Sequence, residues 1–270
     1  MEVKGKHEQL LWGECTWEEI GEAAQANYIV VFPAGAIEQH GPMLPVDVDA
    51  RLAERQAIDG TQRARDKHGL NVLVLPPLPY GQSCIHMKFP GTISLRFETY
   101  IAALCDIMRT VVDFGFRSIA ICNGNGGNQT SLEVARHKLM EDFTREHTEA
   151  RIYLHPGWND PHFQQELARM TETGIYPGEE FGIHAAATET AEMLADRPHL
   201  VKREKMVRPT LKHTSSPAYC WRTDELSETG AFGDPSVATV ELGEQLWEAS
   251  IESVARFLVT ISEETGSGKK

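Results

Sequence analysis

The sequence predicts an α/β fold in which a mostly parallel central sheet lies between two layers of helices, as a three-layer sandwich. Four apolar runs rich in β-branched residues predict strands, at residues 28–32, 71–75, 117–122 and 151–154. They lack a clean polar–apolar alternation, as expected for strands that are buried on both faces. Helical patterns fall between them, and strand and helix in alternation are typical of a parallel sheet covered on both sides.

The helices are predicted from the spacing of apolar residues. Residues 97–112 keep i, i+3, i+4 and i+7 spacing and so present one apolar stripe, and residues 132–143 carry a weaker one. Residues 49–67 are polar with a few small apolar positions, which favours a helix that covers the sheet from outside. Residues 247–261 form a last amphipathic helix. Residues 202–234 are the least regular part, expected to wrap over the site or to pack against another subunit.

Composition excludes several classes of partner. The 270 residues are 41% hydrophobic and carry a formal net charge of -13, so the chain repels phosphate backbones and gains nothing from an anionic membrane. No apolar run approaches the roughly 20 residues of a transmembrane helix, and the N-terminus lacks an apolar core of signal-peptide length. The cysteines form no CxxC pair, which indicates reduced thiols and a cytoplasmic location. They are Cys15, Cys84, Cys105, Cys122 and Cys220.

The loop after the first strand carries metal-ligand types. Ligands bind beyond the carboxyl ends of parallel strands, so this position is informative. In EQHGPMLPVDVDA, Glu38 and His40 are two residues apart and point the same way in extended backbone, and Asp47 and Asp49 follow. Carboxylates and an imidazole are the ligands that Zn²⁺, Mn²⁺ or Fe²⁺ prefers. The alternative is a polar loop in which Asp49 caps the next helix.

Two further loops carry weaker signals. His86 precedes Phe-Pro-Gly-Thr, and by spacing alone it is an exposed histidine in a turn. The run NGNGGNQ, residues 123–129, is rich in glycine, which lets backbone come close to a neighbour, and a helix follows. Such a turn can bind phosphate, but this one lacks the Lys-Ser/Thr of a P-loop and the GxGxxG spacing.

The fourth loop contains FGIHAAATETAEML. His184 and Glu189 are five residues apart, about 500° around a helix, so they do not share a face. They converge only if His184 lies at an unwound helix N-terminus. The alternative is a capped helix with a solvated Glu189, although the neighbouring alanines favour close packing.

These stretches resemble the creatininase (creatinine amidohydrolase) family. The matching segments, in family order, are AGAIEQHGPMLPVDVDA, HMKFPGTISL, NGNGGN, IHAAATETAEML and GAFGDPSVAT, and they span residues from about 28 to 264. The resemblance implies one creatininase-like domain over residues 1–270, a homo-oligomer that is often a hexamer, and a two-metal centre. It also implies hydrolysis of a C–N bond in a small cyclic amide, formamide or related substrate.

The resemblance also assigns roles to residues. Glu38 resembles a ligand of the first metal, His40 and Glu189 resemble ligands of the second, and Asp49 resembles the bridge. His184 matches the family's catalytic histidine. The implied metal is Zn²⁺ or Mn²⁺, with Fe²⁺ as a third candidate. The residues expected to contact substrate are His86, Asn123 and Trp158.

Two departures separate this chain from creatininase itself. The family's NGHGGN has a histidine ligand of the first metal, and here that position is Asn125. An amide oxygen is a weaker ligand, so one or two metals are expected per chain, with Asn125 in the ligand set. The family enzyme also has glutamates where this chain has Gly127 and Ile183, which predicts a different amide as substrate.

The predicted mechanism is attack of a metal-activated water on an amide carbonyl, with His184 passing a proton to the leaving nitrogen. Two alternatives stay open. One is a mononuclear metal enzyme of other chemistry, a lyase or isomerase. The other is a non-catalytic ligand-binding relative that lost its first metal site with Asn125.

Overall fold

The structure, a computed structural model, describes residues 10–176, 184–212 and 221–269. Its centre is a sheet of four parallel strands in the order β2-β1-β3-β4. The strands are β1 (Ile29–Ala34), β2 (Val72–Val74), β3 (Ser118–Asn123) and β4 (Arg151–Leu154). All four predicted strands are confirmed, and their ends lie within two residues of the predicted ones.

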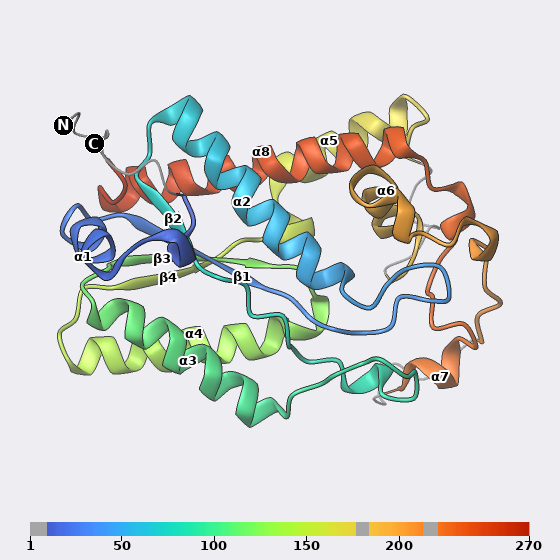
Figure 1. The fold of residues 1–270 in the computed structure, drawn as a ribbon, viewed down its shortest axis with the longest axis horizontal. Coiled ribbons are helices and arrows are strands. Elements are labelled where there is room, and N and C mark those ends of the chain that lie inside the picture. Colours follow the sequence, from blue (N-terminus) through green and yellow to red (C-terminus); the bar gives the residue numbers. More distant parts are fainter. Residues whose placement is uncertain (1–9, 177–183, 213–220, 270) are drawn as a thin grey trace.

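Helices cover both faces of this sheet, so the predicted three-layer sandwich is confirmed (Figure 1). One layer contains α1 (Trp17–Gln25), α3 (Phe97–Asp113) and α4 (Gln129–Arg145). The other contains α2 (Val48–His68) and α8 (Val240–Thr265).

The central strand shows why its sequence does not alternate. Val30 and Phe32 face the core under α1, α3 and α4, whereas Ile29 and Val31 face the core under α2 and α8. Each of these four side chains is at most 1% exposed. Successive residues of a strand point to opposite faces, so a strand covered on both sides needs apolar residues at every position.

Helix α2 was expected to cover the sheet from outside, and it does. Leu52, Ala53 and Ala57 are buried, and the rest of the helix is mostly polar. The helix begins at Val48 after Asp47, whose side chain makes no capping hydrogen bond. The alternative reading of Asp49 as a helix cap is therefore wrong, because Asp49 lies inside the first turn and is buried.

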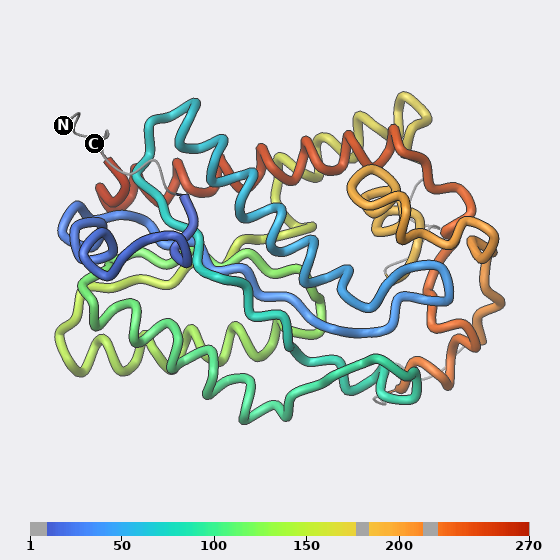
Figure 2. Tube along the Cα trace, in the orientation of Figure 1, coloured from blue at the N-terminus to red at the C-terminus, as the bar shows by residue number. Residues whose placement is uncertain are grey.

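The remaining helices lie at the carboxyl end of the strands. They are α5 (Pro161–Glu172), α6 (Ala187–Asp196) and α7 (Thr223–Leu226). The tube in Figure 2 shows the long loop after β1 reaching the same end of the molecule as the orange segments around α6. Met43 from that loop accepts a backbone hydrogen bond from Lys202, and both segments share one hydrophobic cluster. This packing holds the first and fourth loops together.

Within the described part of the chain, no helix is both long and apolar enough to cross a bilayer. The prediction of a single domain over residues 1–270 stays a prediction.

Candidate active site

Three ligand-type side chains from different elements meet at the carboxyl end of β1. They are His40 in the loop after β1, Asp49 in the first turn of α2 and Glu189 in the first turn of α6. His40 Nε2 lies 3.1 Å from Asp49 Oδ1 and 3.7 Å from Glu189 Oε2. One potential ligand atom from each residue lies within 4.8 Å of the others. The three residues therefore form a candidate metal site.

The chemistry of His40 fits a metal. Its Nδ1 lies 3.1 Å from the Glu38 carbonyl oxygen, which can only accept, so Nδ1–H donates and Nε2 faces the carboxylates. A hydrogen bond from the ring nitrogen that does not bind the metal is what orients a metal-binding imidazole. Within the described residues, the buried His40 Nε2 has only the two carboxylates beside it, and Asp49 Oδ2 is buried without a hydrogen-bond partner. Buried polar atoms are rarely left unpaired, so a buried carboxylate oxygen of this kind beside an imidazole nitrogen fits the place of an ion.

The charges around His40 favour a protonated ring when no metal is bound. Burial alone would lower the pKa of His40, but the carboxylates of Asp49 and Glu189 raise it well above 6.5. Burial opposes ionisation of Glu189, yet His40 brings the pKa of Glu189 to about 2. The metal-free site therefore holds an imidazolium between carboxylates, and a divalent cation would displace its proton.

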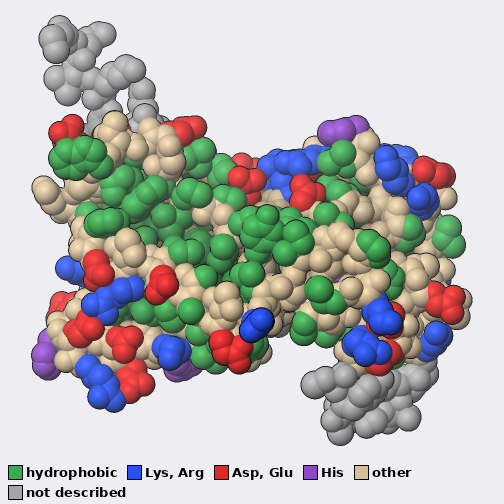
Figure 3. Space-filling view, turned by 60° about the horizontal axis from the view of Figure 1, so that its bottom comes forward, with side chains coloured by type: hydrophobic (Ala, Val, Ile, Leu, Met, Phe, Trp, Pro, Cys, Tyr) green, Lys and Arg blue, Asp and Glu red, His purple; other side chains and the backbone are tan. Residues whose placement is uncertain are grey.

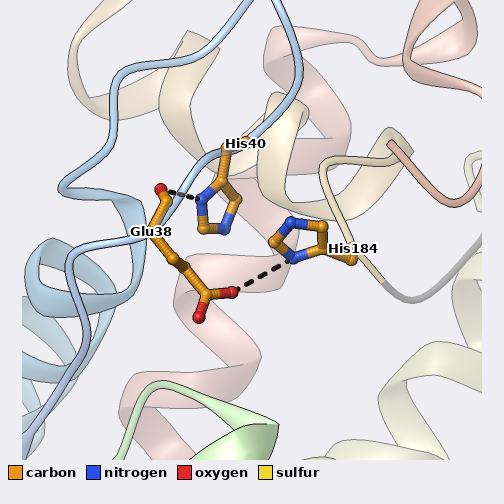
Figure 4. Close-up of side chains that lie close together, drawn as sticks. All are labelled: Glu38, His40 and His184. Atoms are coloured by element: carbon orange, nitrogen blue, oxygen red, sulfur yellow. Dashed lines mark hydrogen bonds and ion pairs between the residues drawn. The ribbon is translucent and has the colours of Figure 1, made fainter. Parts of the chain in front are cut away.

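A second group of ligand types overlaps the first through His40. It consists of Glu38, His40 and His184, again with ligand atoms within 4.8 Å of one another. Figure 4 shows the Glu38 carboxylate directed at the His184 ring, and His40 beside them. His184 Nδ1 lies 3.5 Å from Glu38 Oε1. Burial, and then the charge of Asp49, raise the pKa of Glu38 to about 8.

The tautomer of His184 is set by the backbone. Its Nε2 lies 2.8 Å from the Gln39 carbonyl oxygen, so Nε2–H donates and Nδ1 is left unprotonated, facing the site. Burial, then the nearby His40, lower the pKa of His184 to about 3. His184 is therefore neutral, with its single ring proton on Nε2 and Nδ1 directed at the site.

Gln39 is a residue that the sequence reasoning missed. Its side chain is buried, and Oε1 accepts from the Gly41 N–H at 2.9 Å, which fixes the orientation of the amide. The two hydrogens on Nε2 then have acceptors at the Gly230 carbonyl and at His86 Nδ1, each 2.9 Å away. Gln39 lies inside the EQH motif, but nothing in the spacing shows that it contacts residues 86 and 230.

His86 is buried and not the exposed turn residue that its spacing suggested, because it contacts Glu38, Gln39 and Thr223. Its Nδ1 accepts a hydrogen bond from the Gln39 side-chain amide. The same atom lies 2.7 Å from Thr223 Oγ1, which can also donate. The proton of the neutral ring is therefore on Nε2, 3.3 Å from Glu38 Oε1. Burial lowers the pKa of His86 to about 4, so the ring stays neutral. Its predicted contact with substrate stays a prediction.

Asn125 hydrogen-bonds to Glu38 in this structure. Its Nδ2 donates to Glu38 Oε2 at 2.7 Å, and its Oδ1 accepts from the Gly127 N–H. The backbone N–H can only donate, so it fixes which end of the amide points to Glu38. Glu38 thus receives N–H groups from Asn125 and His86 on its two oxygens. The ligand role expected for Asn125 stays a prediction that metal counting tests.

The glycines of NGNGGN lie against other backbone, as their sequence suggested. A Cβ on Gly124 would lie 2.2 Å from the Asp49 carbonyl oxygen, and one on Gly127 would lie 2.3 Å from the Gln82 carbonyl oxygen. Side chains at these positions would force the turn away from α2 and from the loop after β2. The glycines therefore serve close packing around the site, and the phosphate-binding alternative has no support from them.

We expect Gly124→Ala to destabilise the protein by about 1–3 kcal/mol, since its new Cβ overlaps backbone that cannot yield cheaply. Gly126→Ala is the matched control, because a Cβ there meets nothing within 4 Å and should change stability by less than about 0.5 kcal/mol. Urea unfolding of both variants measures this. Equal midpoints would show that the turn does not need the glycine.

His184 and Glu189 converge in the way that their spacing required. Helix α6 begins only at Ala187, and His184 lies before it in a bridge with Phe232. Ala185 has φ +50°, a left-handed conformation that bends the chain between the two residues. The Ala185 N–H donates to Glu189 Oε2 and holds that carboxylate toward His40. The condition that the spacing set for convergence, an unwound helix N-terminus at His184, is met in the structure.

A cavity of about 410 Å³ opens beside the candidate metal site. Glu189, Asn123, Asn125 and Trp158 contribute to its lining. Trp158 is 48% exposed and packs edge-on against Phe163. The Asn123 side chain is held by hydrogen bonds to Asn125 backbone. Substrate contacts by Asn123 and Trp158 stay predictions.

Two sequence expectations fall partly or wholly outside the described residues. The departure from the family at Ile183 lies outside them. So do residues 213–220 of the irregular region 202–234. In its described part, Thr223 and Gly230 contact the buried site through His86 and Gln39.

Comparisons with known proteins agree with this geometry. The creatininase family model, described as creatinine amidohydrolase, matches residues 13–258. The chain is 29% identical over 242 residues to the mycofactocin precursor peptide peptidase of Mycobacterium tuberculosis, covering 84% of this chain and 83% of the relative. It is 26% identical to the creatinine amidohydrolase of Pseudomonas putida, covering 90% of this chain and 94% of the relative.

Solved creatininase structures share the fold of this chain. A structure described as creatininase Mn superposes with a TM-score of 0.79 at 25% identity, covering 95% of this chain and 98% of that chain. A creatininase variant described as Zn-Zn type has the same TM-score and identity, covering 96% of this chain and 99% of that chain.

Proposed function

The chain belongs to the creatininase family, and from this premise we propose that it hydrolyses a C–N bond in a small amide with one tightly bound divalent metal and His184 as the proton carrier. It is a hydrolase that acts on C–N bonds. The observation that carries the proposal is the group of His40, Asp49 and Glu189, whose ligand atoms lie within 4.8 Å of one another, next to a neutral His184.

His40, Asp49 and Glu189 would hold the metal, which is Zn²⁺ or Mn²⁺ by analogy with the solved relatives. A metal bound there would lower the pKa of a water from 15.7 toward about 7 and would polarise the amide carbonyl. The protein keeps His40 in the correct tautomer through the Glu38 carbonyl and keeps Glu189 in place through the Ala185 N–H.

His184 would move the proton. Its unprotonated Nδ1 faces the site, and its Nε2–H is held by the Gln39 carbonyl, so the ring accepts a proton from the attacking water at Nδ1. The same atom then donates that proton to the leaving nitrogen. Proton transfer by a positioned group of this kind contributes roughly 10²–10⁴-fold in rate. The backbone N–H groups of residues 124, 125, 127 and 128 already donate to acceptors within the protein, so this turn offers few donors to an oxyanion.

We propose one metal because the amide of Asn125 is engaged elsewhere. Its N–H donates to Glu38, where a metal of the first site would otherwise bind. Glu38 is further satisfied by the His86 ring. The N–H groups of Asn125 and His86 already stabilise the charge on the two Glu38 oxygens, as a metal ion would. The first metal site, at Glu38, should therefore bind an ion more weakly than the site at His40, Asp49 and Glu189.

Metal content by elemental analysis tests this proposal. We expect about one ion per chain in the wild type and two in Asn125→His, which places an imidazole beside Glu38. Asn159→His is the control, because Asn159 is exposed at the cavity rim. Two ions in the wild type would mean that Asn125 turns to bind metal. No ion in either protein would favour the ligand-binding alternative over an enzyme.

Analysis of the products distinguishes amide hydrolysis from the mononuclear alternative with lyase or isomerase chemistry. Hydrolysis of an amide releases an amine or ammonia together with a carboxylate, and an isomerase releases neither. Relatives that act on a precursor peptide, on creatinine and on a formylamino-pyrimidine nucleotide define the amide panel to screen. The substrate proposed here is a small cyclic amide, formamide or related compound.

The homo-oligomer and the cytoplasmic location stay predictions. Hydrophobic side chains gather across the middle of the face in Figure 3, with charged residues toward its margins. Phe114 and Trp17 are 59% and 82% exposed. Exposed apolar area of this kind is typical of subunit contacts, which supports the oligomer proposal. Light scattering of the purified protein measures the subunit number.

A further inference from the structure

One carboxyl group in the cavity has no use in the proposed hydrolysis. Glu192 is only 5% exposed and lines the cavity beside Glu189. Its side chain makes no hydrogen bond and no ion pair with residues 10–176, 184–212 or 221–269. Its backbone carbonyl accepts a hydrogen bond from Trp247 Nε1 at 3.0 Å. Burying an unpartnered carboxyl costs free energy, so a ligand in the cavity is the natural partner.

The charges around the cavity favour a cation. The described residues that line it include Glu189 and Glu192 but neither lysine nor arginine. Arg55 is the nearby cation that acts on Glu192, but its guanidinium is bound to Asp196 and Asp59 and lies 4.1 Å from the centre of the Trp247 ring. The positive charge at His40, or a metal there, balances Glu189, but no lysine or arginine of the described lining balances Glu192 against an anionic substrate arm.

The hydrogen-bonding chemistry of Glu192 favours a cation that carries N–H groups. A carboxylate oxygen accepts from N–H donors, and charge-assisted bonds of this kind are the strong ones. Burial and the charge of Glu189 raise the pKa of Glu192 to about 8, and Arg55 offsets them only in part. A bound cation with N–H groups would supply both the charge and the donors.

The helix sets the distance between this contact and the reaction. Glu189 and Glu192 are three residues apart on α6, and residues at that spacing lie about 5–6 Å apart at Cβ on one face. Glu189 belongs to the candidate metal site. A substrate whose carbonyl lies at that site would therefore place a group about one helical turn away against Glu192.

We propose that Glu192 is a specificity residue that binds a cationic N–H group of the substrate, either an ammonium or a guanidinium. This inference rests on the proposed function for the position of the reacting carbonyl. The cation-binding contact itself is measured without turnover, so its failure is distinguishable from failure of the amide hydrolysis.

The test titrates the metal-loaded protein with methylammonium, methylguanidinium and tetramethylammonium, followed by saturation-transfer NMR. We expect Glu192→Gln to weaken binding of at least one of the first two probes by about 10-fold or more, as for loss of a charged hydrogen bond. The probe that binds more tightly identifies ammonium or guanidinium. Tetramethylammonium has the charge but no N–H donor, so it should bind more weakly and lose less affinity in Glu192→Gln than the other two probes.

Glu244→Gln is the matched control, because it removes the same charge from an exposed position on α8 and should change the dissociation constants by less than twofold. Metal content is measured on each protein. Unchanged binding in Glu192→Gln, an equal loss in Glu244→Gln, or loss of metal from Glu192→Gln would overturn the proposal. If metal is absent from the wild type while the probes still depend on Glu192, the hydrolysis proposal fails and this inference stands.

A second variant tests the same inference through stability. Glu192→Met keeps the shape of the side chain and removes the unpartnered carboxyl, so we expect a melting temperature raised by about 2–4 °C together with loss of probe binding. A lower melting temperature would show that Glu192 supports the fold rather than a ligand.

Discussion

Replacing His40 by alanine is expected to remove the bound metal and to lower amide hydrolysis about 1000-fold. His40 is fully buried, and its Nε2 faces both carboxylates of the candidate site. The charge stabilisation that a metal gives to a reacting carbonyl is worth several kcal/mol, and each 1.4 kcal/mol is a factor of ten in rate. Without the imidazole, Asp49 and Glu189 are left as two adjacent carboxylates that bind an ion far less tightly.

The metal loss can be measured apart from activity. A ligand that binds only the folded state adds RT ln(1 + [L]/Kd) to stability, about 2.7 kcal/mol at one hundred times Kd. A chelator should therefore lower the melting temperature of the wild type and leave that of His40→Ala unchanged. His137→Ala, an exposed histidine on α4, is the control and should behave as the wild type. A chelator effect of equal size in His40→Ala would contradict a metal site at His40.

The fold was predictable because its signals are local. Each strand is covered on both sides, so its apolar run has no polar interruption, as Ile29–Ala34 shows. Helix α2 was harder, since apart from Val48 and Leu52 its buried residues are small or polar, such as Ala53 and Ala57. Helix α5 (Pro161–Glu172) was not predicted, although Asp160 caps it and Pro161 begins it, which is a recognisable start signal.

The candidate ligands were predictable because they follow strand ends. Glu38, His40 and Asp49 lie after β1, and the topology of a parallel sheet brings such loops to one edge. Their partners were not predictable. His86 becomes buried only because it meets Gln39 and Thr223, which are 47 and 137 residues away in the chain. Contacts at that separation depend on how the loops pack, and spacing within one loop carries no information about them.

Glu192 had a signal that could have been recognised. It is three residues after Glu189 on the same helix, so both side chains emerge on one face. The sequence could not show that Glu192 has no side-chain partner among the described residues, nor that it lines a cavity. The distinction between a solvated helix carboxylate and a buried one depends on α8, which covers α6 from a segment about 50 residues later and presents Trp247 to the Glu192 backbone.

Replacing His184 by alanine is expected to lower turnover by roughly 10²–10⁴-fold while bound metal stays near the wild-type amount. The ring is neutral, with Nε2–H fixed by the Gln39 carbonyl and Nδ1 free to exchange a proton. His40, Asp49 and Glu189 make a complete ligand group without it. Loss of the imidazole should therefore reduce the chemical step and leave the metal in place.

His184 also lies within ligand distance of Glu38 and His40, so the opposite outcome has a clear meaning. If His184→Ala loses its metal, Nδ1 is a ligand and the proton must be carried by another group, of which Glu38 is the nearest. The two outcomes separate further in the presence of added imidazole. A missing proton carrier can be replaced in part by a small base that enters the cavity, and a lost metal is recovered only by adding metal. Measuring turnover and metal content of His184→Ala with each addition therefore assigns the ring to proton transfer or to the metal.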